Sequence, residues 1–397
     1  MTPDGTKDTK MVRFATAIRN FSKEKGGAER YLADLCTRMA TEGFEVHVFA
    51  ERWDEESKDI HYHRVRTLPF PKSLRLLSFA IRATKGIREG HYDLTLGVGN
   101  TLEADVLQPH GGVHWAWFWR SLRAYDNPFL RILKLSGRIL SVKQWVNGWV
   151  EDAPYKRKIP PKIIAISEMV KQDMIRWYHL PAGRVTVVYN GVDIERFHPR
   201  NRRWREEIRK RHGMGEEFLI LFVSNNFRMK GLGYLIRALS QMRKEGCPPV
   251  KLLILGRDKG APYLRLAERE GLSEDIVFAG STDEPEKYYG AADLLVHPTF
   301  YDACSLTVLE SLASGLPVVT TSCNGAGGLL QQGEDGWVIQ NPRDVDELRM
   351  AIGYFLEEQN RQPACQRARQ KAEACSEEAN LGRMMEIFKE VIKLRFS

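Results

Sequence analysis

Two carboxylates, Asp302 and Glu310, lie close together in the segment YDACSLTVLESLASGLPVVTT, which covers residues 301–321. The run LTVLESLAS predicts a helix that ends at Gly315, and the preceding DLLVHP predicts a strand. The loop YDACS therefore joins a strand to a helix. Carboxylates placed there can accept hydrogen bonds from sugar or ribose hydroxyls. The alternatives are a helix cap for Asp302 and an exposed helix position for Glu310.

The start of that predicted helix is also suited to bind an anion. The first backbone N–H groups of a helix have no partner inside it, and the helix dipole adds positive potential at the same end. A phosphate is the expected ligand of such amides. They belong to Cys304, Ser305, Leu306 and Thr307.

Two further features of the sequence are suited to phosphate. Arg228 and Lys230 lie in the loop of LILFVSNNFRMKGLGYLIRAL, where they could clamp a pyrophosphate, and an ordinary charged loop is the alternative. Gly26 and Gly27 precede a predicted helix over residues 28–42. Glycines there let a phosphate approach the backbone closely, and a plain turn is the alternative.

Short apolar strands alternate with helical segments along the chain, which predicts an α/β protein with parallel, doubly wound sheets. There are two such series, one from Met11 to about Asn190 and one from Phe218 to about Ile339. The polar stretch PRNRRWREEIRKRHGMGEE between them predicts an exposed helix or a domain connection. In doubly wound domains, ligands bind at the carboxyl ends of the strands. The loops with Asp302, Lys230 and the glycine pair occupy such ends.

The bulk properties fit an ordinary globular enzyme. The 397 residues allow two or three domains, and 43% of them are hydrophobic and 28% charged. The six cysteines form no C-x-x-C pair, so we expect reduced thiols in a reducing compartment. The polar start MTPDGTKDTK predicts no signal peptide, and no run approaches the roughly 18 apolar residues of a membrane span.

The net charge of +8 favours an acidic partner. Residues 115–162 contain ten Lys and Arg against three Asp and Glu, and five of the nine Trp. Trp and basic side chains together favour an anionic lipid surface or a phosphorylated, lipid-linked acceptor. A solvated basic face over an aromatic core is the alternative. Nucleic acid is not an expected partner, because no nucleic-acid-binding module is visible.

The segment with Asp302 and Glu310 resembles the signature of retaining glycosyltransferases of family 4, which have the GT-B fold. Their pattern E-x-x-G-x-x-x-L-E-A-x-A-x-G-x-P-V stands here as D-A-C-S-L-T-V-L-E-S-L-A-S-G-L-P-V, with Asp302 in place of the first Glu. The chain resembles most the glucosyltransferases of the lipopolysaccharide core. The resemblance implies two Rossmann-like domains facing a cleft: an acceptor domain (1–190), onto which a helix of about residues 378–397 packs back, and a nucleotide-sugar domain (191–377).

The resemblance also implies roles for individual residues. Glu310 would bind the donor ribose, and Asp302 the donor sugar or its anomeric centre. Arg228 and Lys230 would bind the donor diphosphate. Gly26 and Gly27 would close over that diphosphate from the opposite domain. After the predicted strand LTLGVGN, His110 would be a catalytic residue near the donor sugar, and Asp105 and His114 would contact the acceptor. For the two histidines, an ordinary surface or core position is the alternative.

The implied reaction moves a hexose, with glucose expected, from a UDP-sugar to a lipopolysaccharide core or related lipid-linked glycan. Configuration would be retained, either by attack on the face that the diphosphate leaves or by double displacement. No metal and no cofactor are expected, since Arg228, Lys230 and helix amides can stabilise the leaving charge. The expected location is the cytoplasm, at the inner face of the plasma membrane. Alternatives are a mannosyl- or N-acetylglucosaminyltransferase, a GT-B epimerase or hydrolase, and a non-catalytic binding protein.

Overall fold

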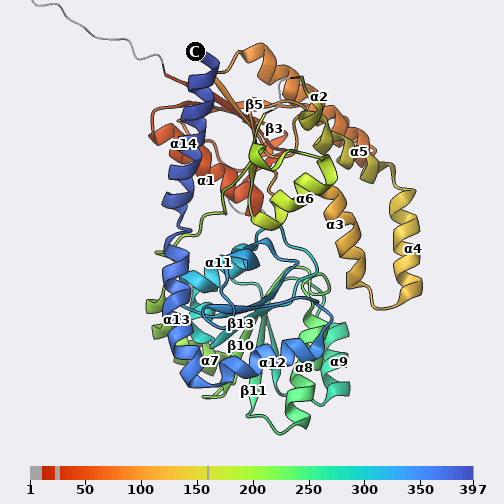
Figure 1. The fold of residues 1–397 in the computed structure, drawn as a ribbon, viewed down its shortest axis with the longest axis vertical. Coiled ribbons are helices and arrows are strands. Elements are labelled where there is room, and N and C mark those ends of the chain that lie inside the picture. Colours follow the sequence, from red (N-terminus) through yellow and green to blue (C-terminus); the bar gives the residue numbers. More distant parts are fainter. Residues whose placement is uncertain (1–10, 23–26, 159–160, 397) are drawn as a thin grey trace, which may run out of the picture.

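The computed structural model describes residues 11–22, 27–158 and 161–396, and it contains two parallel α/β domains (Figure 1). Within the described residues, the first domain has a seven-stranded sheet in the order β5-β3-β1-β6-β7-β8-β9. Its strands are β1 (Arg13–Ala17), β3 (Glu45–Ala50), β5 (Ile60–Arg64), β6 (Leu94–Gly97), β7 (Val106–Leu107), β8 (Lys162–Ala165) and β9 (Val185–Val187). A separate pair joins β2 (Asn20–Phe21) to β4 (Arg52–Trp53). The predicted fold class is confirmed.

The second domain has a six-stranded sheet, again counted over the described residues, in the order β12-β11-β10-β13-β14-β15. Its strands are β10 (Phe218–Val223), β11 (Val250–Leu255), β12 (Ile276–Gly280), β13 (Leu294–His297), β14 (Val318–Thr321) and β15 (Gly336–Ile339). Every pairing in it is parallel. The continuous apolar runs that form β10 and β13 are therefore buried on both faces, as parallel strands covered by helices require.

Helices cover both sheets and connect the strands. The first domain contains α1 (Gly27–Thr41), α2 (Lys72–Gly90), α3 (His114–Arg120), α4 (Pro128–Ile139), α5 (Val142–Asp152) and α6 (Glu168–Tyr178). The second contains α7 (Arg205–Arg211), α8 (Leu232–Lys244), α9 (Ala261–Glu270), α10 (Pro285–Ala291), α11 (Leu306–Ala313), α12 (Val345–Leu356) and α13 (Glu358–Glu373). The final helix, α14 (Glu377–Phe396), follows α13 directly. Short 3-10 turns are η1 (Ser121–Ala124), η2 (Ala153–Lys156), η3 (Ala182–Arg184), η4 (Pro199–Trp204) and η5 (Gly325–Leu329).

The chain crosses between the domains twice. After β9 it enters the second domain, and α14 returns along the first (Figure 1). Met384, Ile387 and Phe388 of α14 belong to the apolar core of the first domain, and the Phe388 ring lies 5.9 Å from that of Phe14. This burial ties the end of the chain to the first sheet.

The polar stretch between the two series forms a helix that is largely exposed, in agreement with one of the two predictions, but one side of it packs on the second domain. It forms η4 and α7, in which Ile208 and Arg209 are buried. The Arg209 guanidinium donates to Asp293 at 2.7 Å and to the backbone oxygen of Ala291 at 3.2 Å. A buried arginine is tolerated because its donors are satisfied in this way.

Candidate active site between the two domains

The loop between β13 and α11 is held by the first domain at three of its residues. The Val113 N–H donates to the Tyr301 hydroxyl at 3.1 Å. The Ser167 hydroxyl donates to the backbone oxygen of Ala303 at 2.7 Å, and the Asn190 amide donates to that of Cys304 at 3.3 Å. One buried apolar cluster continues through this contact from the first domain into the second. The start of α11 is therefore fixed by both domains.

Two glycines make this close contact geometrically feasible. A Cβ atom at Gly325 would overlap the Ser167 hydroxyl of the first domain as well as the backbone oxygen of Ala303, and one at Gly112 would overlap the Tyr301 hydroxyl. Gly112 also has a φ of 73°, in the left-handed region that favours glycine. Neither side of the contact could approach the other as closely with larger residues at these positions.

Lys230 and Asp302 form an ion pair where β10 and β13 end. Gly231, with a φ of 77°, allows the loop before α8 to lie directly against the backbone of Pro298, which brings Lys230 to Asp302. Burial alone would raise the pKa of the Asp302 carboxyl, but the Lys230 ammonium and the His297 imidazole outweigh it and hold that pKa well below its usual range. Asp302 is thus an ionised carboxylate at neutral pH.

Glu310 lies on the pocket side of α11 and accepts a hydrogen bond from the Tyr289 hydroxyl at 2.7 Å. Burial raises the pKa of its carboxyl, an effect that this hydrogen bond and the Arg30 charge oppose only in part. The two carboxylates of the predicted motif therefore have opposite pKa shifts. A partner cation stabilises Asp302, whereas Glu310 is desolvated beside a neutral hydroxyl.

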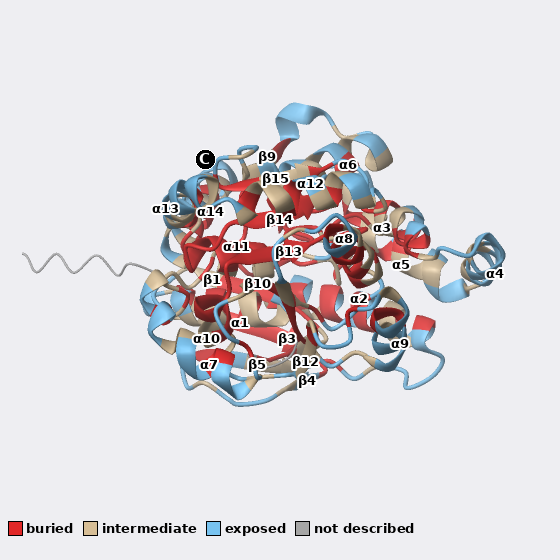
Figure 2. Cartoon of the chain, turned by 90° about the horizontal axis from the view of Figure 1, so that it is seen from below, coloured by how far each residue is buried: buried red, intermediate tan, exposed pale blue. Residues whose placement is uncertain are grey.

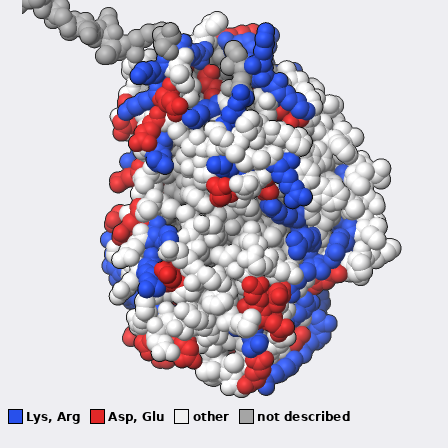
Figure 3. Space-filling view, in the orientation of Figure 1, with Lys and Arg blue, Asp and Glu red and all other residues white. Residues whose placement is uncertain are grey.

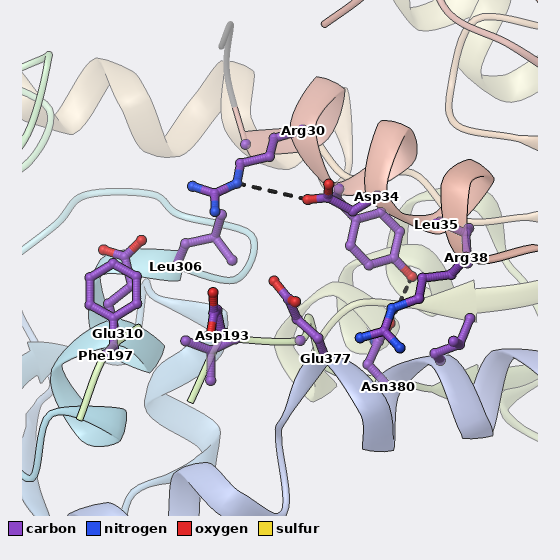
Figure 4. A pocket seen from close by; sticks show the side chains of 15 residues that line it. Arg30, Asp34, Leu35, Arg38, Asp193, Phe197, Leu306, Glu310, Glu377 and Asn380 are labelled. Carbon is purple, nitrogen blue, oxygen red and sulfur yellow. Dashed lines mark hydrogen bonds and ion pairs between the residues drawn. The ribbon is translucent and has the colours of Figure 1, made fainter. Parts of the chain in front are cut away.

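Glu310 lines a pocket between the two domains together with Gly27, Arg30 and Leu306 (Figure 4). Arg30 extends from α1 toward Leu306 and Glu310 on the opposite wall. Gly27 begins α1, and a Cβ atom there would lie 3.1 Å from a methyl carbon of Leu306, so the two domains meet closely at this point. The structure thus brings together three residues that the sequence assigns to the nucleotide sugar, namely Gly27, Leu306 and Glu310.

In the sequence, the amides at the start of α11 lie between Asp302, which pairs with Lys230, and Glu310, which lines the pocket. The Ser305 N–H donates to the side chain of Asn324 at 3.3 Å, so it already has a partner. The Ser305 side chain makes no capping hydrogen bond to the helix. The next amides, at Leu306 and Thr307, are therefore not satisfied by a side-chain cap, which keeps the helix end suited to an anion.

Arg228 and His110 lie near the domain interface. The Arg228 guanidinium lies over the Tyr125 ring of the first domain, with its carbon 4.1 Å from the ring centroid. The His110 ring lies 4.3 Å from that of Tyr31, which lines the interdomain pocket, and burial lowers the His110 pKa to about 4. His110 is consequently neutral at physiological pH.

The two predicted acceptor residues lie apart from each other. His114 begins α3 and lines a basic pocket at the carboxyl ends of β1 and β6, with Lys72 and Lys143. Asp105 precedes β7, at the opposite, amino ends of the strands, where it accepts from Thr95 and from Arg395 of α14. The structure therefore does not bring Asp105 to the cleft. Gly26 lies outside the described residues.

Several residues at the site have no signal in the sequence. His297 lies at the end of β13 with its Nε2 atom 3.7 Å from Asp302, and Tyr289 lies in α10 beneath Glu310. Arg30 is one turn into α1, where it resembles any surface arginine. These three are recognisable only once the two domains are placed together.

Two Rossmann-like domains that face each other across a ligand pocket are the arrangement of the GT-B class of proteins. The family model described as glycosyltransferase family 4 matches residues 25–196, and the model described as glycosyl transferases group 1 matches residues 204–374. The chain belongs to the GT-B glycosyltransferases and is related to the lipopolysaccharide core glucosyltransferases.

Individual proteins with similar sequences are also glycosyltransferases. The chain is 31% identical over 202 residues to an uncharacterized glycosyltransferase of Methanocaldococcus jannaschii, covering 49% of this chain and 50% of that protein. It is 26% identical over 204 residues to the lipopolysaccharide glucosyltransferase WaaG of Escherichia coli, covering 51% and 54%. The matches to these two relatives thus span about half of their lengths.

Two solved structures show the same fold. The crystal structure of WaaG superposes with a TM-score of 0.75 at 21% identity, covering 94% of this chain and 99% of that one. Anabaena HepE in complex with UDP-glucose superposes with a TM-score of 0.68 at 19% identity, covering 95% and 99%.

Glu310→Gln should stabilise the fold at neutral pH. The folded-state pKa of Glu310 is raised, so its ionised form destabilises the folded protein. This destabilisation is absent well below the unfolded pKa of about 4.3 and grows as pH rises through the folded pKa. The free energy of unfolding of Glu310→Gln, relative to wild type, should therefore increase between about pH 5 and about pH 8.

Urea unfolding at the two pH values measures this difference, with Glu274→Gln at an exposed position of the same domain as the control. The control should show no change with pH. A relative stability of Glu310→Gln that stays constant or falls as pH rises would contradict the burial of an ionisable Glu310.

Proposed function

We propose that this protein transfers a hexose from a UDP-sugar to a lipid-linked saccharide, with retention of configuration at the anomeric carbon. The observation that carries the proposal is the arrangement around the start of α11. Lys230 and Asp302 lie on one side of it, Glu310 and Gly27 on the other, and the first domain holds the loop between them. The UDP-glucose complex of HepE, which has the same fold, supports this choice of donor.

The charges at this site suit the departure of a diphosphate. As the glycosidic bond to the leaving phosphate loosens, negative charge grows on that phosphate. The Lys230 ammonium and the first amides of α11 would stabilise it, so the donor site requires no metal ion. The ionised Asp302 carboxylate would accept hydrogen bonds from sugar hydroxyls and stabilise the positive charge on the sugar ring.

Glu310 would position the nucleotide. One of its carboxylate oxygens is bound to Tyr289, and its side chain lies in the interdomain pocket. A carboxylate there accepts a hydrogen bond from a ribose hydroxyl. Gly27 would lie over the diphosphate from the first domain, where the absence of a side chain allows close approach. The acceptor hydroxyl would then attack from the face that the diphosphate leaves.

The acceptor would bind in the basic pocket of the first domain. Glu51 pairs with both Arg19, at 3.3 Å, and Arg75, so its single negative charge offsets one of the four Lys and Arg charges that line the pocket. The Glu151 carboxyl also lines the pocket, and the cations still outnumber the carboxylates. Lys72 and Lys143 have no ion-pair partner among the described residues. They give the pocket a net positive potential that suits a phosphorylated saccharide.

The α4–α5 hairpin would dock on an anionic membrane. It projects from the first domain, and none of its α4 side chains is buried (Figure 2). Phe129 is 70% exposed, Ile132 63% and Leu140 81%. A space-filling view shows the protruding hairpin as mostly uncharged, with Lys and Arg gathered beside it (Figure 3). An apolar surface flanked by cations is suited to a bilayer interface rich in anionic lipids.

No helix in the described ranges is long and apolar enough to cross a bilayer. Trp145 and Trp149 of α5 are exposed and suit the headgroup level, and the Trp145 indole donates to the backbone oxygen of Ile139 at the end of α4. Lys143 lies on the same helix and lines the acceptor pocket, so a docked hairpin would hold that pocket near the lipid. The inner face of the plasma membrane, where nucleotide sugars are available, is the proposed surface.

Lys230→Ala should reduce turnover by about 100-fold or more, because it removes a preorganised charge that stabilises the leaving group. Release of the nucleotide from UDP-glucose, UDP-N-acetylglucosamine and GDP-mannose, with and without a lipid-linked saccharide, measures turnover and identifies the donor. Lys244→Ala is the matched control, since Lys244 is exposed on α8 of the same domain. A folded Lys230→Ala variant within twofold of wild type would refute the proposed role.

Ile132→Glu should abolish most binding to vesicles that contain anionic phosphatidylglycerol, because it places a charge at the centre of the exposed apolar surface of α4. Vesicle co-sedimentation measures the bound fraction. For wild type, this fraction should be lower with neutral vesicles than with anionic ones, and it should also decrease at high salt. Met350→Glu, at an exposed apolar position of α12, is the control and should bind like wild type. Equal binding of wild type to neutral and anionic vesicles would argue against electrostatic docking.

A further inference from the structure

A cluster of histidines lies outside the cleft, on one face of the first sheet. Glu45 and His47 are alternate residues of β3, so their side chains point to the same side. His61 and His63 are alternate residues of the edge strand β5, and His61 is the register partner of His47. The His47 ring lies 4.8 Å from that of His61 and 5.1 Å from that of His63. Four potential metal-binding side chains thus converge from two neighbouring strands.

The donor atoms are close enough for a single ion. One ligand atom each of Glu45, His47 and His61 lies within 4.8 Å of the others. The Nε2 atom of His47 is 2.8 Å from Oε1 of Glu45. Ligands at about 2.0–2.1 Å from a tetrahedral zinc ion stand roughly 3.3 Å apart, so small side-chain rotations would suffice. His47 is buried and His61 is exposed, which gives the cluster an anchor inside the protein and an opening to solvent.

We propose that Glu45, His47 and His61 bind one divalent transition-metal ion, of which zinc is the best match. Two imidazoles and one carboxylate are a common zinc donor set, and the exposed side of His61 leaves a fourth position for water. His63 completes the site without touching the ion. Its Nε2 atom lies 2.8 Å from Nδ1 of His47. The proton of His47 then resides on Nδ1 and is donated to His63, which leaves the Nε2 lone pair for the metal.

The neighbouring cation does not prevent this arrangement. The Arg13 guanidinium donates to Oε1 of Glu45 at 3.3 Å and to the backbone oxygen of Gly90 at 2.8 Å, and it lies over the Tyr92 ring. Arg13 is thus held by the Gly90 carbonyl and the Tyr92 ring, and it binds only one of the two carboxylate oxygens of Glu45. In the part of the chain that the structure describes, no hydrogen bond involves Oε2 of Glu45, so that oxygen is available to the ion.

The position of the cluster indicates a structural role for the ion. β5 is the edge strand of the sheet and is paired only with β3 among the described strands. Glu45 begins β3, so the cluster lies toward the amino ends of the strands, away from the carboxyl ends at the cleft. A metal that links the two strands would fasten the edge of the sheet. It would not take part in transfer of the sugar.

Zinc binding to the full-length, tag-free, metal-stripped protein tests the proposal. Isothermal titration with Zn²⁺ should give one ion per chain and raise the unfolding temperature, and Co²⁺ should give the visible absorption of a tetrahedral site. His61→Ala should weaken Zn²⁺ binding at least tenfold, and His63→Gln should weaken it by about 10- to 100-fold. His61 is exposed on an edge strand, so its variant should fold.

His179→Asn is the control, because His179 lies at the end of α6 with a φ of 53°, a conformation that Asn also adopts readily. It should bind Zn²⁺ like wild type. Removal of the ion should lower the unfolding temperature and leave nucleotide release unchanged, which separates this site from the proposed donor site. A wild-type protein without stoichiometric Zn²⁺ binding, or a His61→Ala variant with unchanged affinity, would overturn the proposal.

Discussion

The site depends on the hydrogen bonds by which the first domain holds the loop that precedes α11. Three hydrogen bonds reach this loop, from Val113, Ser167 and Asn190, and two of them end on backbone carbonyls. Backbone acceptors fix the path of the chain regardless of the side chains it carries. The same loop presents Asp302 and leads directly into the helix that carries Glu310. A change in the relation of the domains would therefore move the whole site.

The two carboxylates of the motif are held by opposite physical means. Asp302 remains ionised because Lys230 and His297 outweigh its burial, whereas burial dominates for Glu310 beside the Tyr289 hydroxyl. An ionised Asp302 suits a role beside positive charge on a sugar ring. Glu310 in its pocket suits recognition of a hydroxyl. Burial of its carboxylate lowers the stability of the folded protein, as is common where a functional polar group is kept between two domains.

Much of this arrangement is predictable, because motifs on strand-to-helix loops converge at the carboxyl ends of parallel strands. That rule predicts the proximity of Lys230 to Asp302, although their direct ion pair requires the left-handed Gly231. Asp105 also adjoins a strand but precedes it, and α14 returns to bind it through Arg395. The local sequence pattern around Asp105 does not predict a contact with a helix that lies at the other end of the chain. The apolar residues of α4 have the spacing of a core helix, but no other part of the described chain covers them, and only the structure shows that they are exposed.

The structure of a complex with UDP tests the central claim most directly. The account predicts the diphosphate within hydrogen-bonding distance of Lys230 Nζ and of the first amides of α11, with a ribose hydroxyl on the Glu310 carboxylate. It also predicts that the contacts from Ser167 and Asn190 to the loop persist. A nucleotide bound elsewhere, or a Glu310 side chain turned away from the ribose, would contradict it.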